Sequence, residues 1–135
     1  MPVFQVHVPA GRFSSEQKRT LGKALPEALH EALGIPAEDQ FVTITGHGPD
    51  ELFLDPQYMG MERRGDAVII TVLFTAERPL SDKRALTRAL CSKVTAALGI
   101  GRDDVFVALI PVPKENFSFG RGELQLAPDS DQTPA

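Results

Sequence analysis

Proline is the second residue of the chain, directly after the initiator methionine. Methionine is commonly removed before a small second residue, and its removal would leave Pro2 with a free secondary amine. Terminal α-amino groups titrate at roughly 7.7–8.0 when unperturbed, and burial beside cations lowers that value toward the range of a general base at neutral pH. Pro2 is therefore a candidate proton-transfer catalyst. The alternative is structural, because proline is tolerated at the first residue of a strand, where no backbone donor is needed.

The other reactive side chains form no comparable constellation. No group of His, Cys and Asp residues has the spacing of a metal site, and no dinucleotide or phosphate loop is present, so no cofactor is expected. Cys91 lies among apolar residues, which predicts a buried thiol rather than a nucleophile. His7 and His47 are expected to be structural or interface residues rather than bases.

Several short segments of the chain recur in register at a shift of 65 or 66 residues. A tandem duplication explains this many matches, whereas chance would explain only one. The matching pairs are 32–35 with 97–100, Asp39 with Asp104, 41–42 with 106–107, and 10–12 with 76–78.

Each half of the chain has the pattern strand, helix, strand. The expected strands are apolar and rich in β-branched residues, and the expected helices carry apolar residues at helical spacing. The strands are 3–8, 41–45, 67–75 and 105–110, and the helices are 15–33 and 82–98.

Local signals predict where the helices begin and end. Ser14 and Gln17 have capping-box spacing, and Gly34 is a glycine stop. Ser81 is the expected cap of the second helix. Pro26, inside the first helix, should kink it or free a carbonyl group.

Two right-handed β-α-β units predict an α/β fold with a four-stranded sheet and two helices on one face. The strand 67–75 is apolar on both faces, so the uncovered face of the sheet favours oligomerisation. Residues 1–127 are expected to form one domain, with repeats at about 2–60 and 66–127. The polar segment 128–135 is expected to be a disordered tail.

Length and composition are those of a small globular protein. The chain has 135 residues, of which 42% are apolar and 24% charged, and a net charge of −4. The sequence shows no basic face, so no nucleic-acid partner is expected. The single cysteine suits a reducing cytosol, and no signal peptide or membrane span is apparent, so a cytoplasmic location and no membrane partner are expected.

Two segments resemble a known family. Segment 2–18 is similar to the start of the 4-oxalocrotonate tautomerases, which have a proline, an apolar-Gln-apolar-His strand, then Gly-Arg-Ser and Glu-Gln-Lys. Segment 117–124 resembles the family's Phe-Gly-x-Gly-Gly-Glu-Leu hairpin. The length and duplication resemble the fused branch of the tautomerase superfamily, which includes malonate semialdehyde decarboxylase and cis-3-chloroacrylic acid dehalogenase. The match to the decarboxylase runs through 34–39, 47–51 and 116–120.

This resemblance implies a homotrimer with one site per chain, because Val68 stands at the duplicate of Pro2. Pro2 would take a proton α to the carbonyl of a small 2-oxo or enol acid and return it at another carbon. The substrate carboxylate would be bound by Arg12 and Arg78, the latter occupying the duplicate position of the former. Asp39 would bind or activate a water, although such an aspartate commonly caps a turn.

The resemblance also implies that Phe119 keeps the proline in an apolar pocket, which lowers the pKa of its amine. The chain departs from the decarboxylase at Thr75 and Glu77, where that enzyme's two arginines would fall. Keto–enol tautomerisation is therefore expected first. A decarboxylase or hydratase with protonated Pro2 as acid, and a non-catalytic trimer that keeps the fold alone, remain as alternatives.

Overall fold

The computed structural model describes residues 2–75 and 77–129 and consists of two β-α-β units. The expected strands and helices are all present, with ends that differ by one or two residues. The first unit is β1 (Pro2–Pro9), α1 (Ser15–Leu33) and β2 (Val42–His47), and the second is β3 (Val68–Phe74), α2 (Leu80–Leu98) and β4 (Val105–Pro111).

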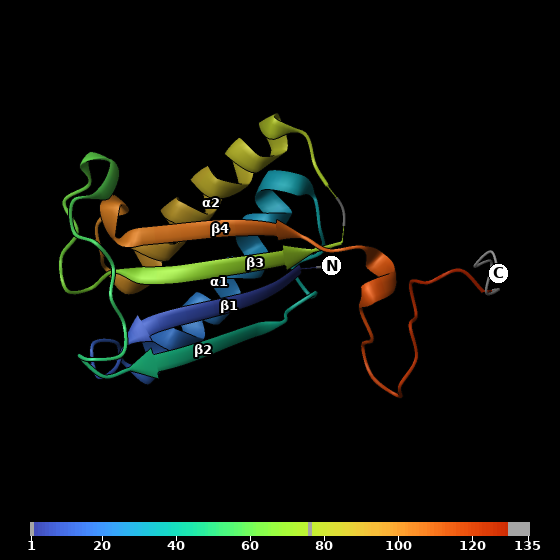
Figure 1. The fold of residues 1–135 in the computed structure, drawn as a ribbon, viewed down its shortest axis with the longest axis horizontal. Coiled ribbons are helices and arrows are strands. Elements are labelled where there is room, and N and C mark those ends of the chain that lie inside the picture. The colour runs from blue at the N-terminus through green and yellow to red at the C-terminus, as the bar shows by residue number, and fades with distance from the viewer. Residues whose placement is uncertain (1, 76, 130–135) are drawn as a thin grey trace.

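The four strands form one sheet in the order β2-β1-β3-β4 (Figure 1). Strand β1 is parallel to β2, and β3 is parallel to β4, as expected for β-α-β units. The two units meet through β1 and β3, which are antiparallel and pair Pro2 with Phe74. The first strand of each unit therefore begins beside the end of the other unit's first strand, in an approximate twofold arrangement.

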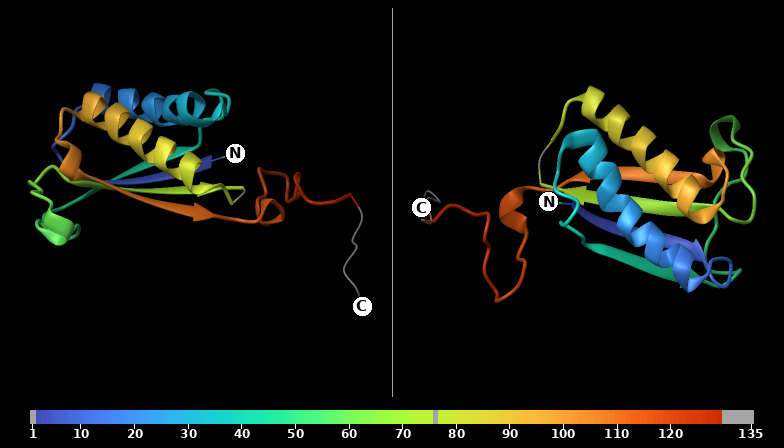
Figure 2. Two further views of the ribbon diagram at one scale, coloured as in Figure 1. Left: turned by 90° about the horizontal axis from the view of Figure 1, so that it is seen from above. Right: turned by 180° about the vertical axis from the view of Figure 1, so that it is seen from behind.

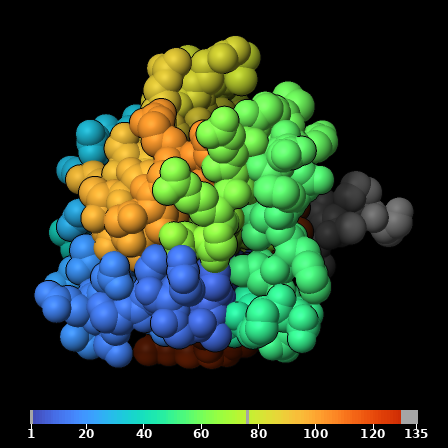
Figure 3. Space-filling model, turned by 90° about the vertical axis from the view of Figure 1, so that its left-hand side faces the viewer, coloured from blue at the N-terminus to red at the C-terminus, as the bar shows by residue number. Residues whose placement is uncertain are grey.

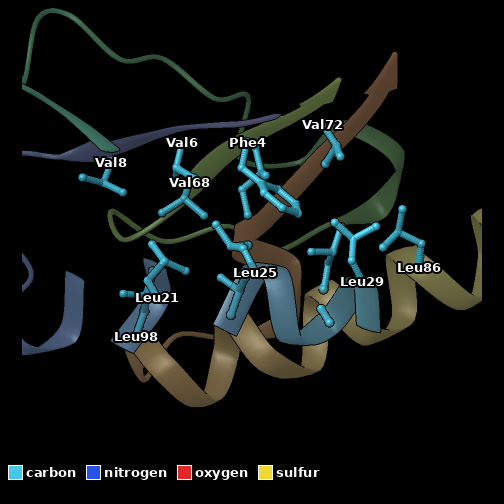
Figure 4. Close-up of a cluster of buried hydrophobic side chains, with 14 of the residues drawn as sticks. Phe4, Val6, Val8, Leu21, Leu25, Leu29, Val68, Val72, Leu86 and Leu98 are labelled. Atoms are coloured by element: carbon cyan, nitrogen blue, oxygen red, sulfur yellow. The ribbon is translucent and has the colours of Figure 1, made fainter. Parts of the chain in front are cut away.

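Both helices cover the same face of the sheet, and the core lies between the two layers (Figure 2). Alternate residues of β1 and β3 point into it, among them Phe4, Val6 and Val72, and they meet Leu25 and Leu29 of α1 (Figure 4). Each fully buried side chain of this size contributes about 1.5–3 kcal/mol. The predicted α/β fold with two helices on one face is confirmed.

The other face of the sheet is uncovered. Residues of β3 and β4 that point away from the helices include Ile69, Phe106 and Ile110, and the last two are 40% and 42% exposed. On the same face, His7 and His47 lie on neighbouring strands, with 2.7 Å between Nδ1 and Nε2. These histidines are thus paired with each other, as expected of structural residues.

Helix α1 begins and ends as its sequence predicts. Ser14 and Gln17 form a reciprocal capping box, and Gly34 adopts a left-handed conformation with φ 72°. Pro26 lacks the N–H that would bond the carbonyl of Gly22, and the side-chain amide of Gln40 donates to that carbonyl at 2.8 Å instead. The freed carbonyl was predicted, but its partner was not.

The predicted cap of α2 is wrong. The helix begins at Leu80 rather than at 82, and its N-cap is Pro79, which makes no side-chain cap hydrogen bond. The carbonyl of Pro79 accepts hydrogen bonds from the backbone amides of Asp82 and Lys83 at 3.0 and 3.3 Å. The N-cap position is therefore Pro79, two residues before the predicted cap Ser81. The predicted buried thiol is also wrong, since Cys91 is only half-buried, with Sγ 4.0 Å from the carbonyl oxygen of Arg102.

After β4 the chain leaves the two-layer body at the end where Pro2 lies (Figures 1 and 2). We call residues 112–129 the C-terminal arm. Its large apolar side chains Phe119, Leu124 and Leu126 are exposed in the single chain. The predicted disordered tail lies outside the described residues from residue 130 onward. Within residues 2–75 and 77–129, no helix is both long and apolar enough to cross a membrane.

Candidate active site

Pro2 is the first residue of β1 and is buried. It shares the inward face of the strand with Phe4, because side chains alternate along a strand. Its neighbour across the sheet is Phe74, at the end of β3, and Phe74 in turn pairs with Pro111, at the end of β4. The candidate catalyst therefore stands where two strands end, in largely apolar surroundings that disfavour a cationic amine.

A hollow of about 300 Å³ lies next to this strand end. We call it the Pro2-side hollow, and it is lined by Thr75, Glu77, Pro111, Val112 and Pro113. The backbone amide of Val112 donates to the carbonyl of Phe74, the residue opposite Pro2, at 2.7 Å. Val112 was not singled out from the sequence, although in the repeat it corresponds to His47 at a shift of 65 residues.

Asp39 lies at the same end of the sheet as Pro2. Its backbone amide donates to the carbonyl of Pro36 at 3.1 Å, in the turn that leads from α1 into β2. The pairing of Phe4 with Val42 places this turn beside the start of β1. The carboxylate of Asp39 is half-buried and accepts no hydrogen bond from the residues that the structure describes.

The duplicate of Asp39 has a different environment. Asp104 is only 3% exposed, and its Oδ1 accepts from the backbone amide of Arg64 at 2.8 Å. This carboxylate is thus used to hold the chain that enters β3. Asp39 has the same place in the first repeat but keeps its oxygens available to a water or a ligand.

Arg78 follows the end of β3, on the side of Pro2. Its Nη1 is 3.5 Å from Oδ2 of Asp82, in the first turn of α2. The preceding residue, Glu77, forms an ion pair with Lys83. The hydrogen bond from Lys83 holds the pKa of the Glu77 carboxyl below its ordinary value. Two ion pairs therefore lie where β3 leads into α2, and of their four residues only Glu77 lines the Pro2-side hollow. The part of Lys83 in these pairs was not predicted.

Arg12 lies at the opposite end of the sheet. It follows the last residue of β1, an eight-residue strand that spans about 25 Å at roughly 3.3 Å per residue. Its guanidinium is paired with Asp66. Within one chain, the structure brings Asp39 and Arg78 to the end that holds Pro2 but does not bring Arg12 there.

Phe119 belongs to the C-terminal arm. Its ring is stacked on that of Phe117 with 6.0 Å between centroids, and its backbone amide donates to Oε1 of Gln125 at 3.0 Å. The side chain remains 40% exposed, and the arm leads away from the sheet (Figure 1). The single chain therefore leaves Phe119 uncovered, and its role beside Pro2 stays a prediction.

Comparison with known proteins identifies the family to which this chain belongs. Two family profiles, both described as Tautomerase enzyme, match residues 2–61 and 39–120. The chain belongs to the tautomerase family. Among curated proteins, it is 31% identical over 126 residues to the probable tautomerase YusQ of Bacillus subtilis (strain 168), covering 93% of this chain and 98% of that protein.

Solved structures with the same fold include two named enzymes. The FG41 malonate semialdehyde decarboxylase inhibited by 3-bromopropiolate is 32% identical, with a TM-score of 0.82 over 91% of this chain and 92% of that chain. A symmetric trimer of a fused 4-OT, designated Q0, is 26% identical, with a TM-score of 0.74 over 90% and 94% of the two chains. The predicted tautomerase-like fold and the predicted family are confirmed.

Proposed function

We propose that this protein is a cofactor-independent tautomerase that moves a proton on a small 2-oxo or enol acid, with the Pro2 amine as base. The observation that carries the proposal is the position of Pro2, which is buried at a strand end, beside a hollow and on the same side as Asp39. The resemblance of segment 2–18 to the 4-oxalocrotonate tautomerases gives this position its chemical meaning.

The chemistry begins once Met1 is removed. The neutral amine of Pro2 takes a proton from the carbon next to the substrate carbonyl, and the electron pair moves onto the carbonyl oxygen to give an enolate. The resulting ammonium then returns the proton, to oxygen or to another carbon, which restores the neutral amine. Burial of Pro2 disfavours the cation and so lowers the pKa of the amine toward that of a useful base.

Substrate binding needs a cation near Pro2. We assign this role to Arg78, which follows β3 at the Pro2 end of the sheet, because its guanidinium can donate two parallel hydrogen bonds to a carboxylate and stabilise charge that develops on the enolate. Asp39 would hold a water or a substrate hydroxyl. Arg12 and Phe119 could contribute to a Pro2 site only from a neighbouring chain.

We infer that the protein is a homotrimer. The uncovered sheet face with Phe106 and Ile110, and the exposed apolar residues of the C-terminal arm, both favour burial against other chains. The fused 4-OT structure with which this chain shares its fold is a symmetric trimer. A trimer would carry three Pro2 sites.

A decarboxylase or hydratase that uses protonated Pro2 as acid is the second candidate. It is favoured by the free carboxylate of Asp39 and by the similarity to a malonate semialdehyde decarboxylase, 30% identical to this chain, that is described with decarboxylase and hydratase activities. Against it, the Pro2-side hollow is lined by Thr75 and Glu77, where the resemblance implies arginines.

The test compares three proteins whose masses show that Met1 is absent: wild type, Pro2→Ala and Asp39→Asn. Each is assayed for ketonisation of phenylenolpyruvate and for decarboxylation of malonate semialdehyde. We expect Pro2→Ala to lower kcat/KM for ketonisation about 100-fold or more, and Asp39→Asn to lower it less. Pro56→Ala, in the exposed connection between β2 and β3, is the matched control.

Two results would redirect the proposal. Ketonisation at the wild-type rate by Pro2→Ala would remove Pro2 from the mechanism. Decarboxylation that is faster than ketonisation and is abolished by Asp39→Asn would make the lyase the better assignment.

A further inference from the structure

The end of the sheet opposite Pro2 carries a second hollow, of about 400 Å³. We call it the Arg12-side hollow. The turn after β1, the loop after β2 and the segment before β3 meet at this end of the molecule, which Figure 3 faces. Its lining includes Arg12, His47 and Arg64 as polar residues and Pro9, Leu52 and Leu54 as apolar ones.

The two hollows occupy equivalent places in the duplicated fold. Pro9 corresponds to Thr75 at a shift of 66, and His47 corresponds to Val112 at a shift of 65. At the Arg12-side hollow the strand that starts nearby is β3, and Val68 stands where Pro2 stands in β1. Because Val68 has an ordinary peptide nitrogen, this end of the fold has no amine with which to move a proton.

Charge distinguishes the two hollows. The described residues that line the Pro2-side hollow include Glu77 and no arginine. Those that line the Arg12-side hollow include two arginines and a histidine, and none of them is acidic. Arg12 is paired with Asp66, whereas Arg64 is an exposed residue whose guanidinium forms no ion pair with the described residues.

These features define a ligand class. An arginine fork matches the geometry of a carboxylate and binds it through two parallel hydrogen bonds. Beside it, Pro9, Leu52 and Leu54 offer an apolar wall. A cavity of this size with apolar walls and a few fixed polar groups is typical of a small-molecule site. The chemistry fits a small carboxylate that carries a short apolar chain.

We propose that the Arg12-side hollow is a second, non-catalytic site that binds a small apolar carboxylate through Arg64 and Arg12. The duplication that placed a catalytic site at one end of the sheet placed a cavity of the same origin at the other end. Val68 supplies no amine there, and the two arginines would bind the carboxylate without chemistry. In this proposal Arg12 serves the Arg12-side hollow of its own chain and not the Pro2 site of a neighbouring chain. The site therefore does not depend on what Pro2 catalyses.

The probe is 3-phenylpropionate, which lacks a carbonyl next to its carboxylate and so cannot tautomerise. It is titrated into the full chain, and ¹H–¹⁵N NMR spectra are recorded. We expect saturable shifts of the amides of Gly48, Gly65 and Ala67, at the Arg12-side hollow. The amides of Thr75 and Val112, at the Pro2-side hollow, should shift less.

Variants assign the site. Arg64→Gln, which leaves the Arg12–Asp66 ion pair in place, should weaken binding about tenfold or more. Arg12→Gln should act in the same direction. Pro2→Ala should leave the titration unchanged, which separates this site from the catalytic one. Arg102→Gln, at an exposed position of the same end, is the matched control.

Three results would overturn the proposal. In the first, the shifts are confined to Thr75 and Val112 or are lost in Pro2→Ala. In the second, Arg64→Gln binds the probe as tightly as wild type. In the third, the uncharged amide 3-phenylpropanamide produces the same shifts with the same affinity, which would show that the arginines do not contribute to binding through the carboxylate.

Discussion

Pro2 and Val68 stand at equivalent positions of the two repeats, yet only Pro2 can carry a secondary amine. Asp39 and Asp104 differ in the same way, since the second carboxylate is buried against a backbone amide and the first is not. The sequence was sufficient to propose Pro2 as the catalyst, because that proposal depends only on its position and residue type. It could not separate the two aspartates, because their difference lies in long-range contacts.

The two aspartates should therefore differ in their contributions to stability. Asp104→Ala removes a buried carboxylate and leaves the backbone amide of Arg64 without its acceptor, so it should lower the free energy of unfolding by about 1–3 kcal/mol. Asp39→Ala, the matched control, should lower it by less than about 0.5 kcal/mol. Urea denaturation measures both, and equal losses would contradict the division of roles.

Glu77 places a negative charge at the edge of the Pro2-side hollow. Because Lys83 lowers the pKa of its carboxyl, Glu77 remains ionised at pH values where an ordinary glutamate begins to protonate. Glu77→Gln should therefore lower KM for a carboxylate substrate about two- to fivefold at neutral pH, since a like charge is removed and Lys83 is released.

Steady-state kinetics at two pH values measure this effect. The difference in KM should be present at neutral pH and should shrink only as the pH falls through the lowered pKa of Glu77. Glu31→Gln, on the outer face of α1, controls for the change in net charge. A higher KM in Glu77→Gln would contradict the assigned role.

At the scale of the elements, local signals predicted α1 but not the start of α2. Ser14, Gln17 and Gly34 act through hydrogen bonds to near neighbours in the chain, so their spacing is sufficient evidence. Helix α2 has no side-chain cap, because its N-cap residue is Pro79, whose side chain has no hydrogen-bonding group. The nearby Ser81 therefore gave a wrong prediction of where the helix begins.

The bond from Gln40 to the carbonyl of Gly22 depends on Pro26 and can be tested by a double-mutant cycle. Gln40→Ala should lower the free energy of unfolding by about 0.5–1.5 kcal/mol in the wild-type background. In the Pro26→Ala background, the new amide of Ala can bond Gly22 itself, so the loss should be smaller by about 0.5 kcal/mol or more. Strictly additive losses would show that the two residues are not coupled.

At the scale of the whole molecule, the repeat predicted two β-α-β units but not which end of the sheet each candidate residue would occupy. Strand β1 carries the chain away from Pro2, which places Arg12 at the far end, while the antiparallel β3 returns Arg78 to the near end. Strand direction and register decide this, and composition and spacing do not contain them. The position of the C-terminal arm was unpredictable for the same reason.

The uncovered sheet face should hold the assembly together. The wild type should sediment as a trimer, at three times the chain mass of 14.7 kDa. Phe106→Glu replaces an apolar side chain on that face with a charged one and should shift the protein to smaller species at micromolar concentration, because a carboxylate is more costly to bury than an aromatic ring. Ala96→Glu, on the outer face of α2, should remain trimeric. A Phe106→Glu trimer as stable as wild type would place the interface elsewhere.

The central claim is that Pro2 works as a neutral amine, and its own titration tests this most directly. The measurement is a ¹⁵N NMR titration of Pro2 in the assembled protein, after mass spectrometry has shown that Met1 is absent. Burial at the start of β1 predicts a pKa below the ordinary range of roughly 7.7–8.0 for a terminal amine, as a general base requires. A pKa well above that range would contradict the account and would identify Pro2 as the cationic acid of a decarboxylase or hydratase.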